Sequence, residues 1–319
     1  MDTHTLTKFL RIVSCSLLSI CTLPAWAFGP DTAPAEVKFN TSYGNTQGTL
    51  NWQIAGGNGG PNILSELTYR NVQFKQFQMS GSTLFKRGPL TNAELFVDYK
   101  TGIASDGSVQ DSDYQTDNRG QEYSRSHSSA NGSRMQDITL GAAYHFQINT
   151  YQSLIPMLAY TRKTQKMLMT EGLQVVDIYN PYNLGPFRNT LNSSYITSWD
   201  SIVMGMGWKM ETQNHELLLN AKFHLLDYHA EADWNLRSDF AHPKSFEHWA
   251  GGNGFGLQLS YAYRFSELFS LWLNWYREDW RTNPGTDVVY LADGSRGTTT
   301  LNEVTWEATG FATGLLFRF

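Results

Sequence analysis

Alternation of apolar and polar residues with a period of two is the feature that most constrains the fold of this 319-residue chain. In the segments 93–100 and 257–265, apolar or aromatic side chains occupy every second position, and polar side chains predominate between them. Successive side chains of a β-strand point to opposite faces, so the pattern predicts strands with one apolar and one polar face. After residue 27, no apolar run approaches the roughly 20 residues that a membrane-spanning helix needs. The sequence therefore excludes helical membrane spans.

Residues 1–27 are predicted to be a secretory signal peptide. A short basic start and an apolar core at 12–21 precede Ala25 and Ala27, which form the small-x-small pattern that a signal peptidase cuts after. Both cysteines of the chain lie in this segment. The mature chain, residues 28–319, is therefore expected to contain no disulfide, no thiol nucleophile and no cysteine-based metal site.

The balance of aromatic and charged residues identifies the kind of strand protein. Aromatic residues make up 14% of the chain, while charged residues make up only 17%. Outer-membrane barrels reach this balance because apolar side chains face lipid, polar ones face the lumen and aromatic girdles mark both interfaces. The last segment, 311–319, alternates and ends on Phe319, as such barrels commonly do. Together with the export signal, these features predict the outer membrane of a Gram-negative bacterium. The mild net charge of −5, with no basic face, argues against a nucleic-acid partner.

The connections between strands alternate in length. Short ones are expected near 86–92, 147–152, 211–215 and 266–268, and long polar ones at 48–62, 105–134, 170–190, 232–251 and 281–302. This predicts an all-β, transmembrane antiparallel barrel of about ten strands, with short periplasmic turns and long extracellular loops, as one domain over 28–319. Side chains should fill most of so narrow a lumen, because open aqueous channels belong to barrels of roughly 16 strands. A diffusion porin is therefore disfavoured.

The expected second long loop contains the densest acidic cluster, centred on Asp111 and Asp113. Two carboxylates held close together share a proton and shift each other's pKa, which suits a pair that activates water. The alternatives are a solvated acidic loop and a weak calcium site, although the twelve-residue calcium pattern is incomplete. Farther along, His229 follows Asp227 by two residues, and it is either a catalytic group or a hydrogen-bonded interfacial residue. No His-Glu-x-x-His pattern and no close histidine pair is present, so no metal is expected.

Several motifs, taken in order, resemble those of the omptins, which are ten-stranded outer-membrane endopeptidases with an active site in an extracellular groove. The motifs are Ser42-Tyr43-Gly44 with Gly48, the strand Leu64 to Arg70, the segment Asp111-Ser112-Asp113-Tyr114, Tyr160 at the start of a strand, and the end Leu316-Phe317-Arg318-Phe319. They span nearly the whole mature chain. The resemblance implies that Asp111 and Asp113 form one of the two catalytic pairs of the family.

The second catalytic pair of the family is an Asp and a His two residues later, in the fourth loop. At the family spacing from Lys222, Asp233 falls on the Asp and Asn235 falls on the His. An Asn side chain can hold a water molecule but cannot accept its proton, so the resemblance implies an endopeptidase scaffold with altered, weak or lost activity. Asp227 and His229 offer the right spacing in a register shifted by six residues, and they are the alternative catalytic pair.

The resemblance also implies binding residues and partners. Glu231 falls where omptins place a carboxylate that receives the basic side chain of the substrate, whereas Trp52 replaces the corresponding Glu of the first loop. Arg162 and Lys163 are the nearest candidates for basic contacts to lipopolysaccharide. Lipopolysaccharide is implied as a structural activator, and no other cofactor is expected. The expected partners are outer-membrane lipid, lipopolysaccharide, cationic peptides and host proteins.

Three functions from different classes remain open at this point. The first is an omptin-like endopeptidase of altered activity. The second is a non-catalytic binding or adhesion barrel whose acidic loops bind a cationic ligand, a host protein or lipopolysaccharide. The third is a narrow porin, in which acidic residues would only bias the passage of cations.

Overall fold

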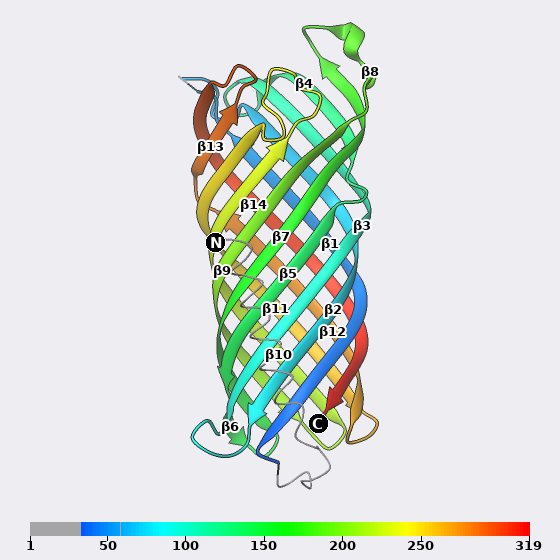
Figure 1. The fold of residues 1–319 in the computed structure, drawn as a ribbon, viewed down its shortest axis with the longest axis vertical. Coiled ribbons are helices and arrows are strands. Elements are labelled where there is room, and N and C mark those ends of the chain that lie inside the picture. The colour runs from blue at the N-terminus through cyan, green and yellow to red at the C-terminus, as the bar shows by residue number, and fades with distance from the viewer. Residues whose placement is uncertain (1–32, 58) are drawn as a thin grey trace.

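Long strands follow from the period-two pattern, and they close into one antiparallel barrel (Figure 1). The computed structural model describes residues 33–57 and 59–319, so the predicted signal peptide lies outside the described residues. Within the described residues, no helix is long and apolar enough to cross a membrane. The predicted all-β antiparallel fold is confirmed.

The ring has about ten strand positions, because β4 and β5 occupy the upper and lower parts of one position between β3 and β7. Pairing of β14 with β1 closes the barrel. The ring strands, in order, are β1 (Ala35–Ile54), β2 (Ser65–Phe85), β3 (Ala93–Thr116), β4 (Gly120–Ser129), β5 (Arg134–Tyr144), β7 (Gln152–Asp177), β9 (Asn192–Glu211), β10 (His215–Asp233), β11 (Phe246–Arg264), β12 (Phe269–Thr282) and β14 (Arg296–Arg318). Short elements decorate it: β6 (Phe146–Asn149), β8 (Gly185–Pro186), β13 (Gly285–Tyr290) and the 3-10 helix η2 (Pro181–Asn183).

The expected long loops are mostly strand. The stretch 105–134 was expected to be a loop, yet β3 runs on to Thr116 and β4 begins at Gly120. The strands therefore extend well beyond the apolar belt, and their backbone ladders remain paired where the outer face is polar. Long connections between neighbouring ring strands follow β7 (178–191) and β10 (234–245). The prediction was wrong here because an antiparallel strand can expose one face to water, so a polar composition does not end it.

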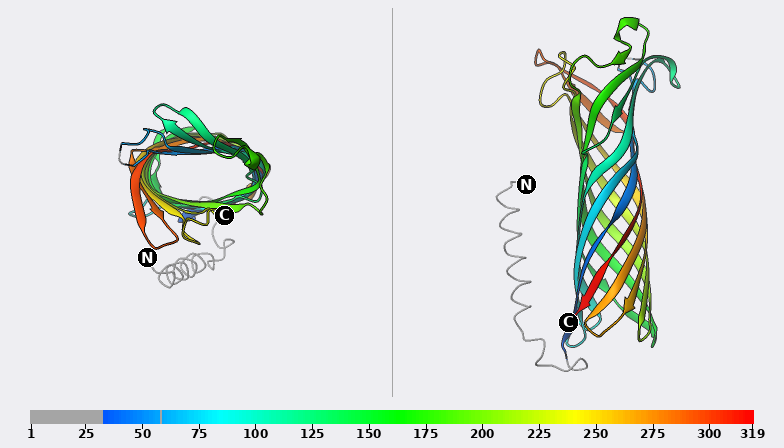
Figure 2. Two further views of the ribbon diagram at one scale, coloured as in Figure 1. Left: turned by 90° about the horizontal axis from the view of Figure 1, so that it is seen from above. Right: turned by 90° about the vertical axis from the view of Figure 1, so that its right-hand side faces the viewer.

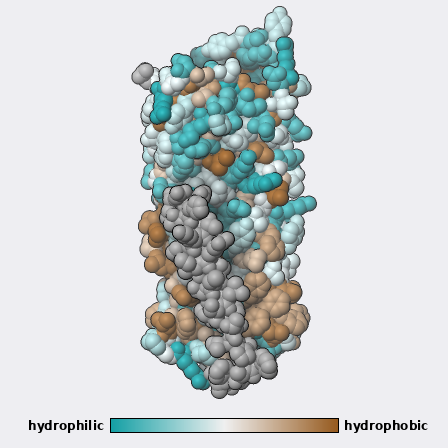
Figure 3. All heavy atoms as spheres, viewed as in Figure 1, coloured by the Kyte–Doolittle hydropathy of each residue, from teal (hydrophilic) through white to brown (hydrophobic). Residues whose placement is uncertain are grey.

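Outward apolar side chains form a belt around the lower half of the barrel, where the short turns lie, β1 begins and β14 ends (Figure 1). Figure 3 shows this belt on one face. Its outward side chains are Tyr43, Phe77, Met79, Leu95, Leu140, Leu158, Ile202, Met204, Leu225, Phe255, Leu257, Leu271, Phe311 and Leu315. Above it, most outward positions are polar or charged, as at Arg162 and Lys166 on β7. The belt marks the membrane, so the short turns are periplasmic and the upper half is extracellular.

Polar side chains fill the lumen at and below the level where the belt ends. Lys163 is 1% exposed, lies 3.5 Å from Asp137 and also pairs with Glu278. Nearer the periplasm, Glu216 accepts hydrogen bonds from Lys38 at 3.0 Å and from Arg318 at 2.8 Å. A cavity of about 280 Å³ remains among these groups. The polar faces predicted for 93–100 and 257–265 line this space, as expected.

In the extracellular half, large side chains pack across the barrel, which is flattened in cross-section (Figure 2). We call its aromatic members the aromatic plug. They are Trp52, Tyr69, Phe74, Tyr195, Trp199, Tyr228, Phe246, Trp280 and Trp306, each at most 7% exposed. They come from β1, β2, β9, β10, β11, β12 and β14 and form one core cluster.

Candidate functional site

The carboxylate pair lies near the extracellular end of β3 and on its inward face. Asp111 is opposite Leu67 of β2, and Asp113 is opposite Ser65. Both share the face of Val109, which is buried in the core cluster two residues earlier. The structure therefore brings the two predicted carboxylates together, on a rigid strand rather than on the expected loop.

Burial dominates the electrostatics of this pair. It raises the pKa of Asp111 well above its usual value, and the neighbouring Asp113 charge raises it further. Burial also raises the pKa of Asp113, against hydrogen bonds from Ser65 and Ser124. The charge of Arg237 and a hydrogen bond from the Trp234 side chain oppose the shift at Asp111. The pair therefore holds a proton more readily than exposed carboxyls do, and its catalytic role remains a prediction.

The residues expected on the opposite side face away from the lumen. On β10 the buried, inward side chains are Tyr228, Ala230 and Ala232. The alternative pair Asp227 and His229 occupies positions that alternate with these, so both side chains lie on the outer wall. Small alanines thus occupy the inward positions where a His or Asp would have to stand to face Asp111.

Glu231 and Asp233 follow the same parity as His229. Glu231 forms an ion pair with Lys244 at 2.7 Å. At the rim, an Asp233 carboxylate oxygen lies 2.7 Å from the His242 Nδ1. The prediction that Asp233 belongs to the catalytic site is therefore wrong. Lys222 lines the lumen, and Asp233 lies an odd number of residues beyond it on the same strand, so the two side chains point to opposite faces. Neither Glu231 nor Asp233 shares a groove with the carboxylate pair.

Asn235 has a structural arrangement of its own. Its side-chain oxygen accepts hydrogen bonds from the Asn192 backbone at 2.9 Å and the Ser193 hydroxyl at 3.0 Å. Its amide nitrogen donates to the Thr190 carbonyl at 3.0 Å. These bonds fasten the start of the β10–β11 connection to the start of β9, so this side chain is engaged in loop anchoring.

A second histidine–aspartate pair, which the sequence did not indicate, lies inside the barrel. His248 of β11 is 0% exposed, and its Nε2 lies 3.1 Å from an Asp287 carboxylate oxygen of β13. Its Nδ1 is 2.8 Å from the Tyr195 hydroxyl. The only sequence signal was the inward parity that His248 shares with Phe246, because β13 had not been expected as a strand.

Aromatic rings separate this buried pair from the carboxylates. Trp52 and Phe246 contact the His248 ring at centroid distances of 5.3 and 5.1 Å. The same two rings contact Trp234 at 6.4 and 4.7 Å, and Trp234 hydrogen-bonds Asp111. Packed side chains therefore occupy the place where a substrate groove would have to bring a water molecule between the two pairs.

Of the two candidate lipopolysaccharide contacts, only one faces outward. Arg162 stands on the outer wall directly above the apolar belt, and its Nε lies 3.7 Å from Asp200. Lys163 points into the lumen, so it cannot contact lipid. Farther up, Arg134 of β5 and Lys166 of β7 are directly opposite each other, and both are exposed.

Comparison with known proteins places the fold. The model of the Protochlamydia outer membrane protein family, Pom, matches residues 40–319. No curated protein matches by sequence. The crystal structure of the outer membrane protease OmpT from Escherichia coli is similar, with a TM-score of 0.72 and 14% identity over 90% of this chain and 98% of that chain.

Other outer-membrane barrels match more distantly. OprG from Pseudomonas aeruginosa matches at 8% identity with a TM-score of 0.34, over 89% of this chain and 96% of that chain. The translocator domain of the autotransporter NalP from Neisseria meningitidis matches at 9% identity with a TM-score of 0.35, over 99% and 98%. The predicted outer-membrane location is confirmed, and the omptin resemblance is confirmed for the fold alone.

Proposed function

The chain belongs to the Protochlamydia outer membrane protein family, and from this premise we propose that it is a sealed, omptin-like barrel that does not cleave peptides and acts by binding at its outer surface. The proposal takes the reading of a lost proteolytic activity over that of a weak one. It also disfavours the narrow porin, because packed side chains cross the extracellular half of the described barrel.

One observation carries the proposal: the aromatic plug stands where an omptin-like barrel would need a groove. Trp52, which replaces an acidic residue of the omptin first loop, is 3% exposed and contacts four other rings of the site. Inward positions of β10 offer Ala230 and Ala232 instead of a proton acceptor. The carboxylates Asp111 and Asp113 thus face no proton acceptor on β10, and the rings of Trp52 and Phe246 cover His248, the histidine inside this half of the described barrel. Offering the refolded protein a peptide with two consecutive basic residues tests this, since an omptin should cleave it and this barrel should leave it intact.

The outer wall supports binding of an anionic lipid headgroup, for which lipopolysaccharide is the source in an outer membrane. Arg134 and Lys166 are cross-strand neighbours of like charge, an arrangement that costs stability unless an anion lies between them. Among the described residues, neither forms an ion pair with an acidic side chain. They stand above the belt, in line with Arg162, where headgroups lie.

Loss of these two charges is expected to weaken binding of lipopolysaccharide about 30-fold, since each basic residue near a charged lipid surface contributes about 1 kcal/mol. The variant is Arg134→Gln with Lys166→Met, and the measurement is titration of the detergent-refolded barrel with purified lipopolysaccharide. Arg119→Gln serves as the control, because Arg119 already pairs with Glu66 at the rim. Equal affinity of the double variant and the control would contradict this part of the proposal.

A further inference from the structure

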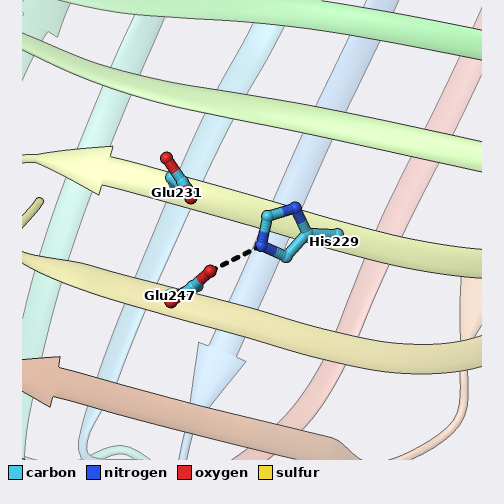
Figure 4. Close-up of side chains that lie close together, drawn as sticks. All are labelled: His229, Glu231 and Glu247. Carbon is cyan, nitrogen blue, oxygen red and sulfur yellow. Dashed lines mark hydrogen bonds and ion pairs between the residues drawn. The ribbon is translucent and has the colours of Figure 1, made fainter. Parts of the chain in front are cut away.

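A cluster of side chains that can bind a metal lies on the two paired strands β10 and β11 (Figure 4), at positions that alternate with the inward residues Tyr228, Ala230 and His248. It consists of His229 and Glu231 on β10 and Glu247 on β11. One ligand atom from each residue lies within 4.8 Å of the others, and the His229 Nε2 is 2.8 Å from a Glu247 oxygen. A histidine nitrogen and two carboxylate oxygens are a ligand set that zinc accepts.

Strand geometry places these three side chains together. His229 and Glu231 are two residues apart and so point to the same face of β10. Glu247 is the direct cross-strand partner of Glu231, on the same face. A site built on two paired strands is held more precisely than one on a loop.

Neighbouring groups orient the ligands. The Tyr290 hydroxyl of β13 donates to the second Glu247 oxygen at 2.7 Å, which leaves the first oxygen for His229. The Trp249 ring lies against the His229 ring at a centroid distance of 5.6 Å. Such outer partners fix the orientation of ligands in known metal sites.

A cation already occupies the space between the carboxylates. The Lys244 ammonium lies 2.7 Å from a Glu231 oxygen and 2.9 Å from a Glu247 oxygen. Together with Tyr290 and His229, its hydrogen bond and charge lower the pKa of Glu247 to about 2, against the effect of burial. Lys244 belongs to the connection between β10 and β11, and its side chain is 35% exposed, so it can move out into water.

We propose that His229, Glu231 and Glu247 form a binding site for a divalent transition metal of the zinc class, and that the metal displaces the Lys244 ammonium. Tetrahedral coordination separates ligand atoms by about 3.4 Å, so the His229 and Glu247 atoms, now 2.8 Å apart, need to move apart by about 0.6 Å. Three protein ligands leave one coordination position facing the medium. At that position the metal can accept water or a donor group from a partner. Imidazole favours zinc, copper or nickel over calcium and magnesium.

The test is titration of the detergent-refolded barrel with Zn²⁺ at pH 7.5, in competition with a chromogenic chelator. The expected result is one equivalent bound, with binding lost in His229→Ala and in Glu231→Gln. Lys244→Met is expected to bind at least about tenfold more tightly, because the competing cation is gone. His127→Ala, which removes a histidine of β4, should leave the affinity unchanged.

The Lys244 variant separates this site from adventitious binding by exposed histidines. Absence of binding in both the parent and Lys244→Met would overturn the proposal, and so would undiminished binding in His229→Ala. Both His229 and Glu231 are partly exposed on the outer wall, so their variants should fold, which heat-modified gel migration would verify. The zinc titration does not depend on peptide cleavage, so a failure to bind zinc leaves the proposed function standing.

Discussion

Lys163→Met is expected to destabilise the barrel by about 3–5 kcal/mol, which is the cost of leaving buried charges without their partner. The Lys163 ammonium pairs with Glu278, lies 3.5 Å from Asp137 and stands over the Trp280 ring at 4.1 Å. Methionine preserves most of the apolar stem but removes the charge, so two carboxylates in the lumen lose their main cation. Urea unfolding in detergent, followed by tryptophan fluorescence, measures the change.

Lys166→Met is the matched control for this prediction. Lys166 lies three residues farther along β7 but points outward and is exposed, so its replacement should change the free energy of unfolding by less than about 0.5 kcal/mol. Equal effects of the two substitutions would show that the lumen ion pairs do not stabilise the barrel.

Trp199→Ala is expected to cost a similar amount, about 3–5 kcal/mol, because it opens a cavity in the aromatic plug. Trp199 is 0% exposed, and its ring lies 4.2 Å from the Tyr228 ring and 5.8 Å from the Trp280 ring, measured between centroids. Its indole nitrogen donates a hydrogen bond to the Gln165 side-chain oxygen at 3.1 Å. The truncated site loses these contacts and leaves the Gln165 oxygen with one donor fewer. The same unfolding experiment measures the loss.

Trp249→Ala is the comparison for the plug substitution. Trp249 is 40% exposed on the outer wall, and its replacement should cost clearly less than that of Trp199. If Trp199→Ala unfolds at the same urea concentration as the parent, the extracellular half is not the packed core described above.

The barrel could be predicted from the sequence because its pattern is local. Side chains such as Leu95 and Leu257 alternate with lumen residues, and the structure places them on the lipid face. The extent of the strands could not be predicted in the same way. Above the belt both faces of β3 carry polar residues, so Asp111 and Asp113 read as part of a loop although backbone pairing with β2 continues through them.

Only one of the two sides of the candidate site could be predicted from the sequence. Asp111 and Asp113 are adjacent on one inward face because two residues of separation on a strand guarantee it. The predicted partners on β10 were wrong because a residue faces the lumen only at every second position of a strand. A count from Lys222 at the family spacing does not determine which positions these are. The buried contact of His248 with Asp287 joins residues far apart in the chain through a strand, β13, that carries no motif.

The proposed metal cluster on the outer wall also depends on strand pairing that the sequence does not reveal. The sequence offers His229 as a catalytic group for the groove, and it predicts no metal because it shows neither a His-Glu-x-x-His pattern nor a close histidine pair at metal spacing. On the outer face of β10 the useful neighbour is instead a carboxylate on the paired strand, Glu247, which faces Glu231 through the β10–β11 register. Cross-strand proximity of this kind is not visible in the order of the residues.

Peptide cleavage tests the central claim most directly. The refolded barrel, with lipopolysaccharide, would be incubated with a fluorogenic peptide that contains two consecutive basic residues, beside Asp111→Asn and His229→Ala. We expect no cleavage by the parent and no difference between the parent and either variant, because the aromatic plug leaves no place for substrate and water. Cleavage by the parent that disappears in Asp111→Asn would contradict the claim that the barrel is sealed and would show that it is an active endopeptidase.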